Sequence, residues 1–155
     1  MASWQSKFVK MSFRWQRFRG QGQLGADIEA ERERFGRQLA RLKPPEEVAF
    51  SETKAGDRPA LWVVPPDIRR EGVVLFLHGG AYLIGSIQGY RALAAAIAMS
   101  AGMRALILDY RLAPEHPFPA AVEDAQAAYQ WLLAEGHKPQ QIVVAGDSAG
   151  GGLTL

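Results

Sequence analysis

Three short apolar runs, separated by longer amphipathic segments, constrain the fold of this chain most. They occupy residues 73–77, 104–108 and 142–145, and the second begins with Arg104. Strands buried on both faces of a parallel sheet are continuously apolar in this way, whereas strands with one wet face alternate. Helix-length segments lie between the runs, and alternating strands and helices form an open α/β sheet. The sequence therefore predicts an α/β fold in which helices flank a mostly parallel sheet.

Capping residues indicate where the intervening helices begin and end. Ser86 is suited to cap a helix that runs to about Ala101, with Gly102 in the left-handed position after it. The next helix is predicted to turn four residues at helical spacing toward the sheet: Val122, Ala125, Tyr129 and Leu132. A third helix is predicted to begin at Ser148. Ligands bind such sheets at the carboxyl ends of the strands, so the loops there are the candidate sites.

The first part of the chain has a different pattern. Residues 1–19 carry five cations without an acidic partner, beside a narrow apolar stripe at helical spacing formed by Trp4, Phe8, Met11, Trp15 and Phe18. Such a stripe is typical of a helix packed on its own domain, and contact with a lipid surface or an apolar substrate stays open. A second helix is predicted from the N-cap Asp27 to Leu42, where Lys43 and two prolines end it.

The composition changes after the prolines. Strands are predicted over residues 47–53 and 60–65, joined by turn residues. We therefore divide the chain into a helical N-terminal cap region over residues 1–45 and an α/β core over residues 46–155.

Composition excludes several classes of protein. Cysteine is absent, which rules out disulfides, thiolate metal sites and cysteine nucleophiles, and is typical of a cytoplasmic protein. The net charge of +2 is too small to favour nucleic acid as a partner. No apolar run approaches the ~20 residues that a membrane helix needs, so we expect no stable membrane insertion. The sequence leaves open whether the protein forms a homo-oligomer.

A glycine-flanked serine follows the third apolar run. Gly146-Asp147-Ser148-Ala149-Gly150 fits the pattern G-x-S-x-G between a predicted strand and a predicted helix. The glycines let strand and helix approach closely, and the sharp turn exposes the serine oxygen as a nucleophile. A phosphate-binding loop would need a lysine after the glycines, and a dinucleotide site would need G-x-G-x-x-G; neither is present. A purely structural glycine-rich turn stays open.

A second motif, His78-Gly79-Gly80-Ala81, follows the first apolar run. Consecutive backbone N–H groups in a glycine-containing loop can converge on one oxyanion. Ala81 keeps its N–H group, so it remains a candidate donor.

Together with residues 109–120, these motifs resemble the hormone-sensitive-lipase-like carboxylesterases of the α/β-hydrolase superfamily. The matching stretches are HGGAY at 78–82, DYRLAPEHPFPA at 109–120 and GDSAGG at 146–151, within a resemblance that covers residues 72–155. The resemblance implies an α/β-hydrolase fold that is truncated after the nucleophile elbow, the strand–turn–helix segment at Ser148. It also implies N-terminal cap helices before the core.

The resemblance also implies roles for single residues. Ser148 would be the nucleophile. Gly79, Gly80, Ala81 and Ala149 would form the oxyanion hole, with the N–H groups of Gly80, Ala81 and Ala149 as its donors. Ala81 stands where the family more often has a third glycine, which keeps the donor but adds a methyl group to the pocket.

The function implied is hydrolysis of short- to medium-chain carboxylic esters through an acyl-enzyme, with a small-molecule ester as substrate and no metal or organic cofactor. In this family the triad acid and histidine lie well beyond the nucleophile, hence outside these 155 residues, so we expect the chain alone to be inactive. Two alternative functions are compatible with the sequence: hydrolysis of lactones or aryl amides, and ligand binding by a catalytically inactive module with the same fold.

None of the three histidines is expected to be the general base. In the hydrolase fold the base follows the nucleophile in chain order, so His78 is expected to hold its loop in shape by hydrogen bonding. His116 lies in a segment that the family uses structurally, and His137 lies at the opposite end of the predicted sheet.

Two carboxylates beside the motifs are given supporting roles. Asp147 is expected to hydrogen-bond and stiffen the elbow, with Gly146 and Gly150 on either side. Asp109, Arg111 and Glu115 are expected to form a buried polar network that braces the loop after the second strand, because buried charges are normally paired.

Overall fold

The computed structural model describes residues 27–155, so the predicted helix over residues 1–19 lies outside the described residues. Within residues 27–155, five strands form a sheet in the order β1-β2-β4-β3-β5. The bounds of the strands are Ala49–Ala55 for β1, Arg58–Val64 for β2, Val73–Leu77 for β3, Arg104–Leu108 for β4 and Ile142–Gly146 for β5.

The sheet is parallel where the candidate site lies and antiparallel at the other edge. β3 pairs in parallel with β4 on one side and with β5 on the other. β1 and β2 form an antiparallel hairpin, and β2 pairs with β4 in antiparallel register. The predicted α/β class, with helices flanking the sheet, is confirmed; the sheet was predicted to be mostly parallel and is mixed within residues 27–155.

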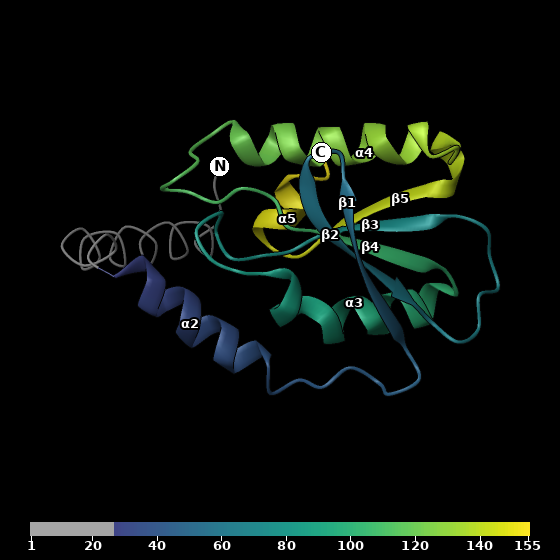
Figure 1. Cartoon of the computed structure of the whole chain (residues 1–155), viewed down its shortest axis with the longest axis horizontal. Helices are drawn as coiled ribbons and strands as arrows, with labels where there is room; N and C mark the ends of the chain where they lie inside the picture. The colour runs from purple at the N-terminus through teal and green to yellow at the C-terminus, as the bar shows by residue number, and fades with distance from the viewer. Residues whose placement is uncertain (1–26) are drawn as a thin grey trace, which may run out of the picture.

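Helices cover both faces of this sheet (Figure 1). α2 and α3 lie on one face, and α4 and α5 lie on the other, with a short 3₁₀ turn before β5. The helices are Ile28–Leu39 for α2, Ile87–Ala101 for α3, Ala120–Ala134 for α4 and Ala149–Gly152 for α5.

Each face of the sheet has its own apolar core. Phe76 and Ile107 point to the α3 side and pack with Tyr90. Their strand neighbours point to the α4 side, where Leu77 and Leu132 belong to the second core. Side chains of successive strand residues alternate between faces, so β3 and β4 contribute to both cores. β3 is buried throughout, and β4 is buried after Arg104.

The predicted caps of α2 and α3 are present. Asp27 accepts a hydrogen bond from the N–H group of Ala30 at 3.0 Å, and Ser86 accepts one from Gly89 at 3.2 Å. Gly102 follows α3 in the left-handed conformation at φ 61°. α2 ends at Leu39, before the predicted Leu42.

The predicted inner face of α4 is wrong in phase at its start. Val122 is 45% exposed, whereas Ala125 and Leu132 are buried as predicted. The other buried residues in the same turns are Ala121, Asp124 and Ala128. The helix turns Asp124 inward because Arg111 and Arg58 reach its carboxylate there.

The predicted burial of the third apolar run is also wrong in this chain. Val143 in β5 is 49% exposed. β5 pairs with β3 on one side, and within residues 27–155 it is the outer strand of the sheet. An outer strand lacks the cover that β3 receives from both neighbours.

The boundary at residue 45 stays a prediction. α2 contacts the core through Leu39, which packs beside Gly89 on α3. No helix among residues 27–155 combines the length and apolarity needed to cross a membrane.

Candidate active site

The register of the three parallel strands brings their following loops together. Leu77 is paired with Leu108 of β4 and with Gly146 of β5. The next residues along the chain, His78, Asp109 and Asp147, therefore leave the sheet at the same edge. This edge is the carboxyl end of the strands, where open α/β sheets bind ligands.

Ser148 occupies the turn between β5 and α5 in an uncommon conformation. Its φ is 49° and its ψ is −112°, and the residue is exposed. The turn depends on two close approaches: a Cβ atom on Gly146 would collide with the backbone of Gly150, and one on Gly150 would collide with the carbonyl group of Leu77. Only glycine fits at these two positions, so the chain presents the serine at the tip of a sharp, strained turn.

The loop after β3 has three consecutive residues with positive φ. They are Gly80 at 123°, Ala81 at 56° and Tyr82 at 63°. The carbonyl oxygen of Gly80 accepts hydrogen bonds from the N–H groups of Leu83 and Ile84, both at 3.0 Å. Left-handed backbone at non-glycine residues costs energy and is commonly found where a loop serves a site.

The backbone donors of the site are available. Among the described residues, the N–H groups of Gly80 and Ala81 are not used in a backbone hydrogen bond. Ala149 is the first residue of α5, and the first N–H groups of a helix have no acceptor within it. Tyr82 links the two segments, because its hydroxyl donates to the carbonyl oxygen of Ala149 at 2.9 Å.

His78 lies under the loop and away from solvent. It is 0% exposed, its ring stacks on Tyr110 at 4.2 Å between centroids, and its Nδ1 atom lies 2.9 Å from the carbonyl oxygen of Gly79. Its Nε2 atom has no hydrogen-bond partner in the described part of the chain. Burial lowers the pKa of His78 below its usual value, because desolvation disfavours the charged ring.

The other two histidines are also placed elsewhere. His116 is exposed on the loop before α4. His137 lies 2.9 Å from Arg104, which begins β4 at the opposite end of the sheet.

Asp147 has a partner that the sequence did not reveal. The hydroxyl of Tyr90, on α3, donates to its Oδ2 atom at 2.9 Å. Burial first, and then the hydrogen bond to Asp147, raise the pKa of Tyr90 to about 12, so the phenol remains a neutral donor.

The predicted network of Asp109, Arg111 and Glu115 is wrong. Arg111 instead binds Asp124, with its Nη2 atom 2.7 Å from Oδ1 and its backbone N–H 2.8 Å from Oδ2. The carboxylate of Asp124 is the buried one, at 4% exposure. The partners lie on the loop and on α4, so their pairing depends on where the helix docks.

Glu115 is bound by Arg32 of α2. The guanidinium contacts both carboxylate oxygens, at 2.8 and 2.7 Å, and also donates to the carbonyl oxygens of Leu83 and Ala113. The Arg32 hydrogen bonds lower the pKa of Glu115 to about 2. α2 therefore ties together the loop after β3 and the loop after β4.

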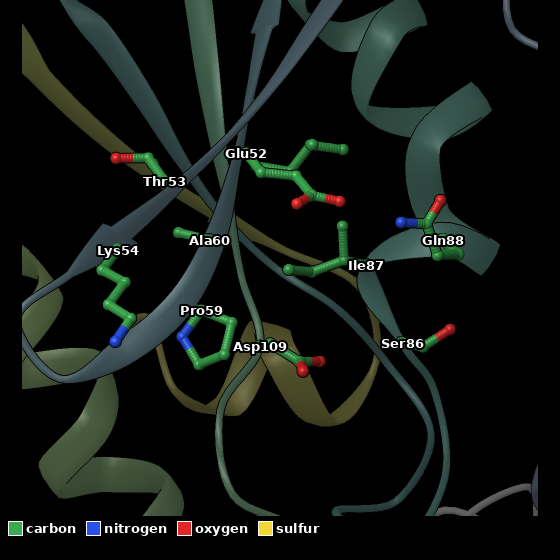
Figure 2. A pocket seen from close by; sticks show the side chains of 10 residues that line it. Glu52, Thr53, Lys54, Pro59, Ala60, Ser86, Ile87, Gln88 and Asp109 are labelled. Atoms are coloured by element: carbon green, nitrogen blue, oxygen red, sulfur yellow. The ribbon is translucent and has the colours of Figure 1, made fainter.

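Two cavities flank these loops. One, of about 460 Å³, is lined mainly by apolar groups and borders the loop after β3 through Ala81 and Tyr82 and α5 through Gly152 and Leu153. The other, of about 380 Å³, lies between the β1–β2 hairpin and the start of α3, with Glu52, Ile87 and Asp109 in its lining (Figure 2). Residues 27–155 contain no group of three or more side chains able to hold a metal ion.

Comparison with known proteins agrees with this geometry. A family profile described as the alpha/beta hydrolase fold matches residues 74–155. An acetyl-hydrolase from Streptomyces hygroscopicus is 52% identical over 97 residues, which are 62% of this chain and 32% of that protein. The carboxylesterase/phospholipase LipF of Mycobacterium tuberculosis is 48% identical over 83 residues, 54% of this chain and 22% of LipF.

A solved structure is similar over a larger part of the chain. The crystal structure of an esterase from the bacterial hormone-sensitive lipase family superposes with a TM-score of 0.79 at 45% identity, covering 82% of this chain and 43% of the esterase. This chain thus spans less than half the length of these relatives. It belongs to the α/β-hydrolase fold family, and over most of its length it is similar to an esterase of the bacterial hormone-sensitive lipase family.

Proposed function

We propose that the protein is a serine carboxylesterase in which Ser148 is the nucleophile. The observation that carries the proposal is the turn at Ser148, an exposed serine at φ 49° between a parallel strand and a helix. The backbone donors of Gly80, Ala81 and Ala149 lie in the two segments that Tyr82 joins. This is the arrangement that acyl transfer requires, with a nucleophile and oxyanion donors supplied by adjacent loops.

In the proposed reaction the Ser148 Oγ atom attacks the ester carbonyl carbon while its proton passes to a general base. The carbonyl oxygen becomes an oxyanion that the backbone N–H groups stabilise. The bond to the alcohol oxygen then breaks, and the base gives its proton to the departing alcohol. Water next attacks the acyl-enzyme and passes a proton to the base. The acid is released as the base returns that proton to Ser148.

The base and its acid partner are proposed to lie outside these 155 residues, because the three histidines here are buried, exposed on another loop, or at the far end of the sheet. The apolar cavity beside Ala81 supports an ester with an apolar acyl or alcohol group of short to medium length. Cytoplasmic location and oligomeric state stay predictions.

The test is ester turnover by the product of the complete reading frame, with p-nitrophenyl acetate and butyrate as substrates. Ser148→Ala should lower kcat by about 10⁶-fold, the size of the loss when the serine of another triad is removed. Ser100→Ala, at an exposed position on α3, is the matched control and should turn over normally. A protein that binds these esters without Ser148-dependent turnover would be a binding module instead.

A further inference from the structure

Three segments of the site meet at the hydroxyl group of Tyr90. The hydroxyl donates to Asp147, the residue before the serine. A Cβ atom added to Gly79, in the loop after β3, would lie 2.8 Å from the same hydroxyl and would collide with the Asp147 carboxylate. The phenol of α3 therefore sits where the nucleophile elbow touches the loop that carries Gly80 and Ala81.

The position of this hydroxyl is set by the core. Tyr90 is 4% exposed, and its ring packs against Phe76 of β3, His78 and Phe35 of α2, with centroids 6.0, 5.6 and 6.4 Å apart. These contacts on three sides hold the ring in one position. The hydroxyl therefore holds the Asp147 carboxylate that it binds at a fixed place relative to the core.

The hydrogen bond to Asp147 is of the strong kind. One partner is a carboxylate and the other is largely removed from water, and both conditions strengthen a hydrogen bond. Among the described residues, Tyr90 is the side chain that the Asp147 carboxylate is bonded to. Apart from Tyr90 and the Tyr82 hydroxyl on Ala149, the elbow is held by backbone bonds, Asp147 N–H to the Leu77 carbonyl oxygen at 3.2 Å and Gly150 N–H to the Asp147 carbonyl oxygen at 2.8 Å.

We propose that Tyr90 is a positioning residue that fixes the distance between the Ser148 nucleophile and the oxyanion loop, acting through Asp147 and Gly79. The inference rests on the proposed function, since it assigns Tyr90 a part in the same reaction. Tyr90 touches no reacting atom. Its contribution is to hold two loops from different strands in the one geometry in which the oxygen that attacks and the donors that receive the charge face the same carbonyl group.

A geometric role of this kind predicts a particular kinetic signature. Loosening the elbow misplaces the nucleophile relative to the oxyanion donors in the transition state but leaves the ester-binding surface in place. An interaction that matters mainly in the transition state lowers kcat and kcat/KM together and leaves KM unchanged.

The experiment measures kcat and KM for p-nitrophenyl butyrate in the product of the complete reading frame. Tyr90→Phe removes only the hydroxyl, Asp147→Leu removes the acceptor in a side chain of similar size, and Asp147→Asn keeps a carbonyl acceptor. Tyr129→Phe, on α4 at the other face of the sheet, is the matched control.

We expect Tyr90→Phe and Asp147→Leu each to lower kcat about tenfold with KM within about twofold of the wild type, in line with the loss of one charge-assisted hydrogen bond. The double variant should be no slower than the slower single variant, because both remove the same interaction. Asp147→Asn should restore most of kcat, and Tyr129→Phe should leave it unchanged.

The proposal is overturned if Tyr90→Phe keeps kcat within about twofold, if the two losses multiply in the double variant, or if Asp147→Asn is as slow as Asp147→Leu. If Tyr90→Phe strongly lowers the melting temperature, the kcat values of Asp147→Leu and Asp147→Asn, at an exposed position, test the proposal instead. Turnover at the wild-type rate in Ser148→Ala would overturn the proposed function. Turnover that is lost in Ser148→Ala but unchanged in Tyr90→Phe would overturn only the role of Tyr90.

Discussion

The hydroxyl of Tyr82 donates a hydrogen bond to the main-chain carbonyl oxygen of Ala149 over 2.9 Å. Tyr82 ends the run of three left-handed residues after β3, and Ala149 is the first residue of α5. The bond therefore crosses from the proposed oxyanion loop to the segment that carries the proposed nucleophile. It is the outer of two such links, since Tyr90 joins Asp147 to the same loop from the core side.

Removing this outer link should slow catalysis modestly. Tyr82→Phe keeps the ring and deletes the hydroxyl, and a neutral hydrogen bond of this kind contributes about 1 kcal/mol. We expect kcat/KM for a short-chain ester to fall about fivefold, the equivalent in rate of that energy. Steady-state kinetics on the product of the complete reading frame checks this, and a value equal to that of the wild type would show that the link has no role in turnover.

The strain at Ala81 leads to a second prediction. At φ 56° an alanine is held in a conformation that costs about 1 kcal/mol, which glycine adopts without penalty. Ala81→Gly should therefore leave the melting temperature unchanged or slightly raised, and should keep kcat within about twofold, since the N–H donor remains. Ala81→Val keeps the donor as well, but its branched side chain should lower the melting temperature.

Differential scanning calorimetry on the two Ala81 variants gives the comparison. Equal melting temperatures for the glycine and valine variants would contradict the left-handed conformation of this residue. Ala81→Pro would remove the N–H donor but would also disturb the loop, because the fixed φ of proline, about −65°, is opposite in sign to the φ of Ala81.

Burial of His78 predicts a dependence of stability on pH. Desolvation lowers the pKa of His78 in the folded protein below 6.5, so the unfolded chain binds more protons as the pH falls. The contribution of the neutral ring to stability is present in full above pH 6.5, and it is lost as the pH falls from 6.5 toward the lowered pKa.

Urea unfolding at pH 7.5, 6.5 and 5.5 measures this dependence. The decrease in the free energy of unfolding toward pH 5.5 should become smaller in His78→Gln, and it should persist in His116→Gln, where the histidine is exposed. An identical decrease in wild type and His78→Gln would assign the proton uptake to another group.

The elements and the site differ in how far the sequence determined them. The strands and the caps at Asp27 and Ser86 were predictable because each depends on a short local pattern. The elbow was predictable for the same reason, since Gly146 and Gly150 stand next to Ser148 in the chain. The exposure of Val143 was not, because it depends on which strands lie beside β5.

The contacts of the supporting residues depend on distant segments and were missed. Tyr90 has the position of an ordinary core residue of an amphipathic helix, and nothing near it in the chain indicates that its hydroxyl reaches Asp147. Arg32 and Glu115 are charged residues on a helix and a loop, each of a kind that usually faces solvent. Asp124 was not predicted to face the sheet, because charged residues on a helix are normally exposed and its partner Arg111 lies on another segment, the loop after β4.

Covalent labelling tests the central claim most directly. The product of the complete reading frame would be treated with a fluorophosphonate, digested, and mapped by peptide mass spectrometry, with Ser148→Ala and Ser100→Ala treated in parallel. The account predicts one adduct, on Ser148, formed at the rate at which ester turnover is lost and absent from Ser148→Ala alone. An adduct on another residue that accompanies the loss of turnover, or turnover that continues after Ser148 is fully labelled, would contradict it.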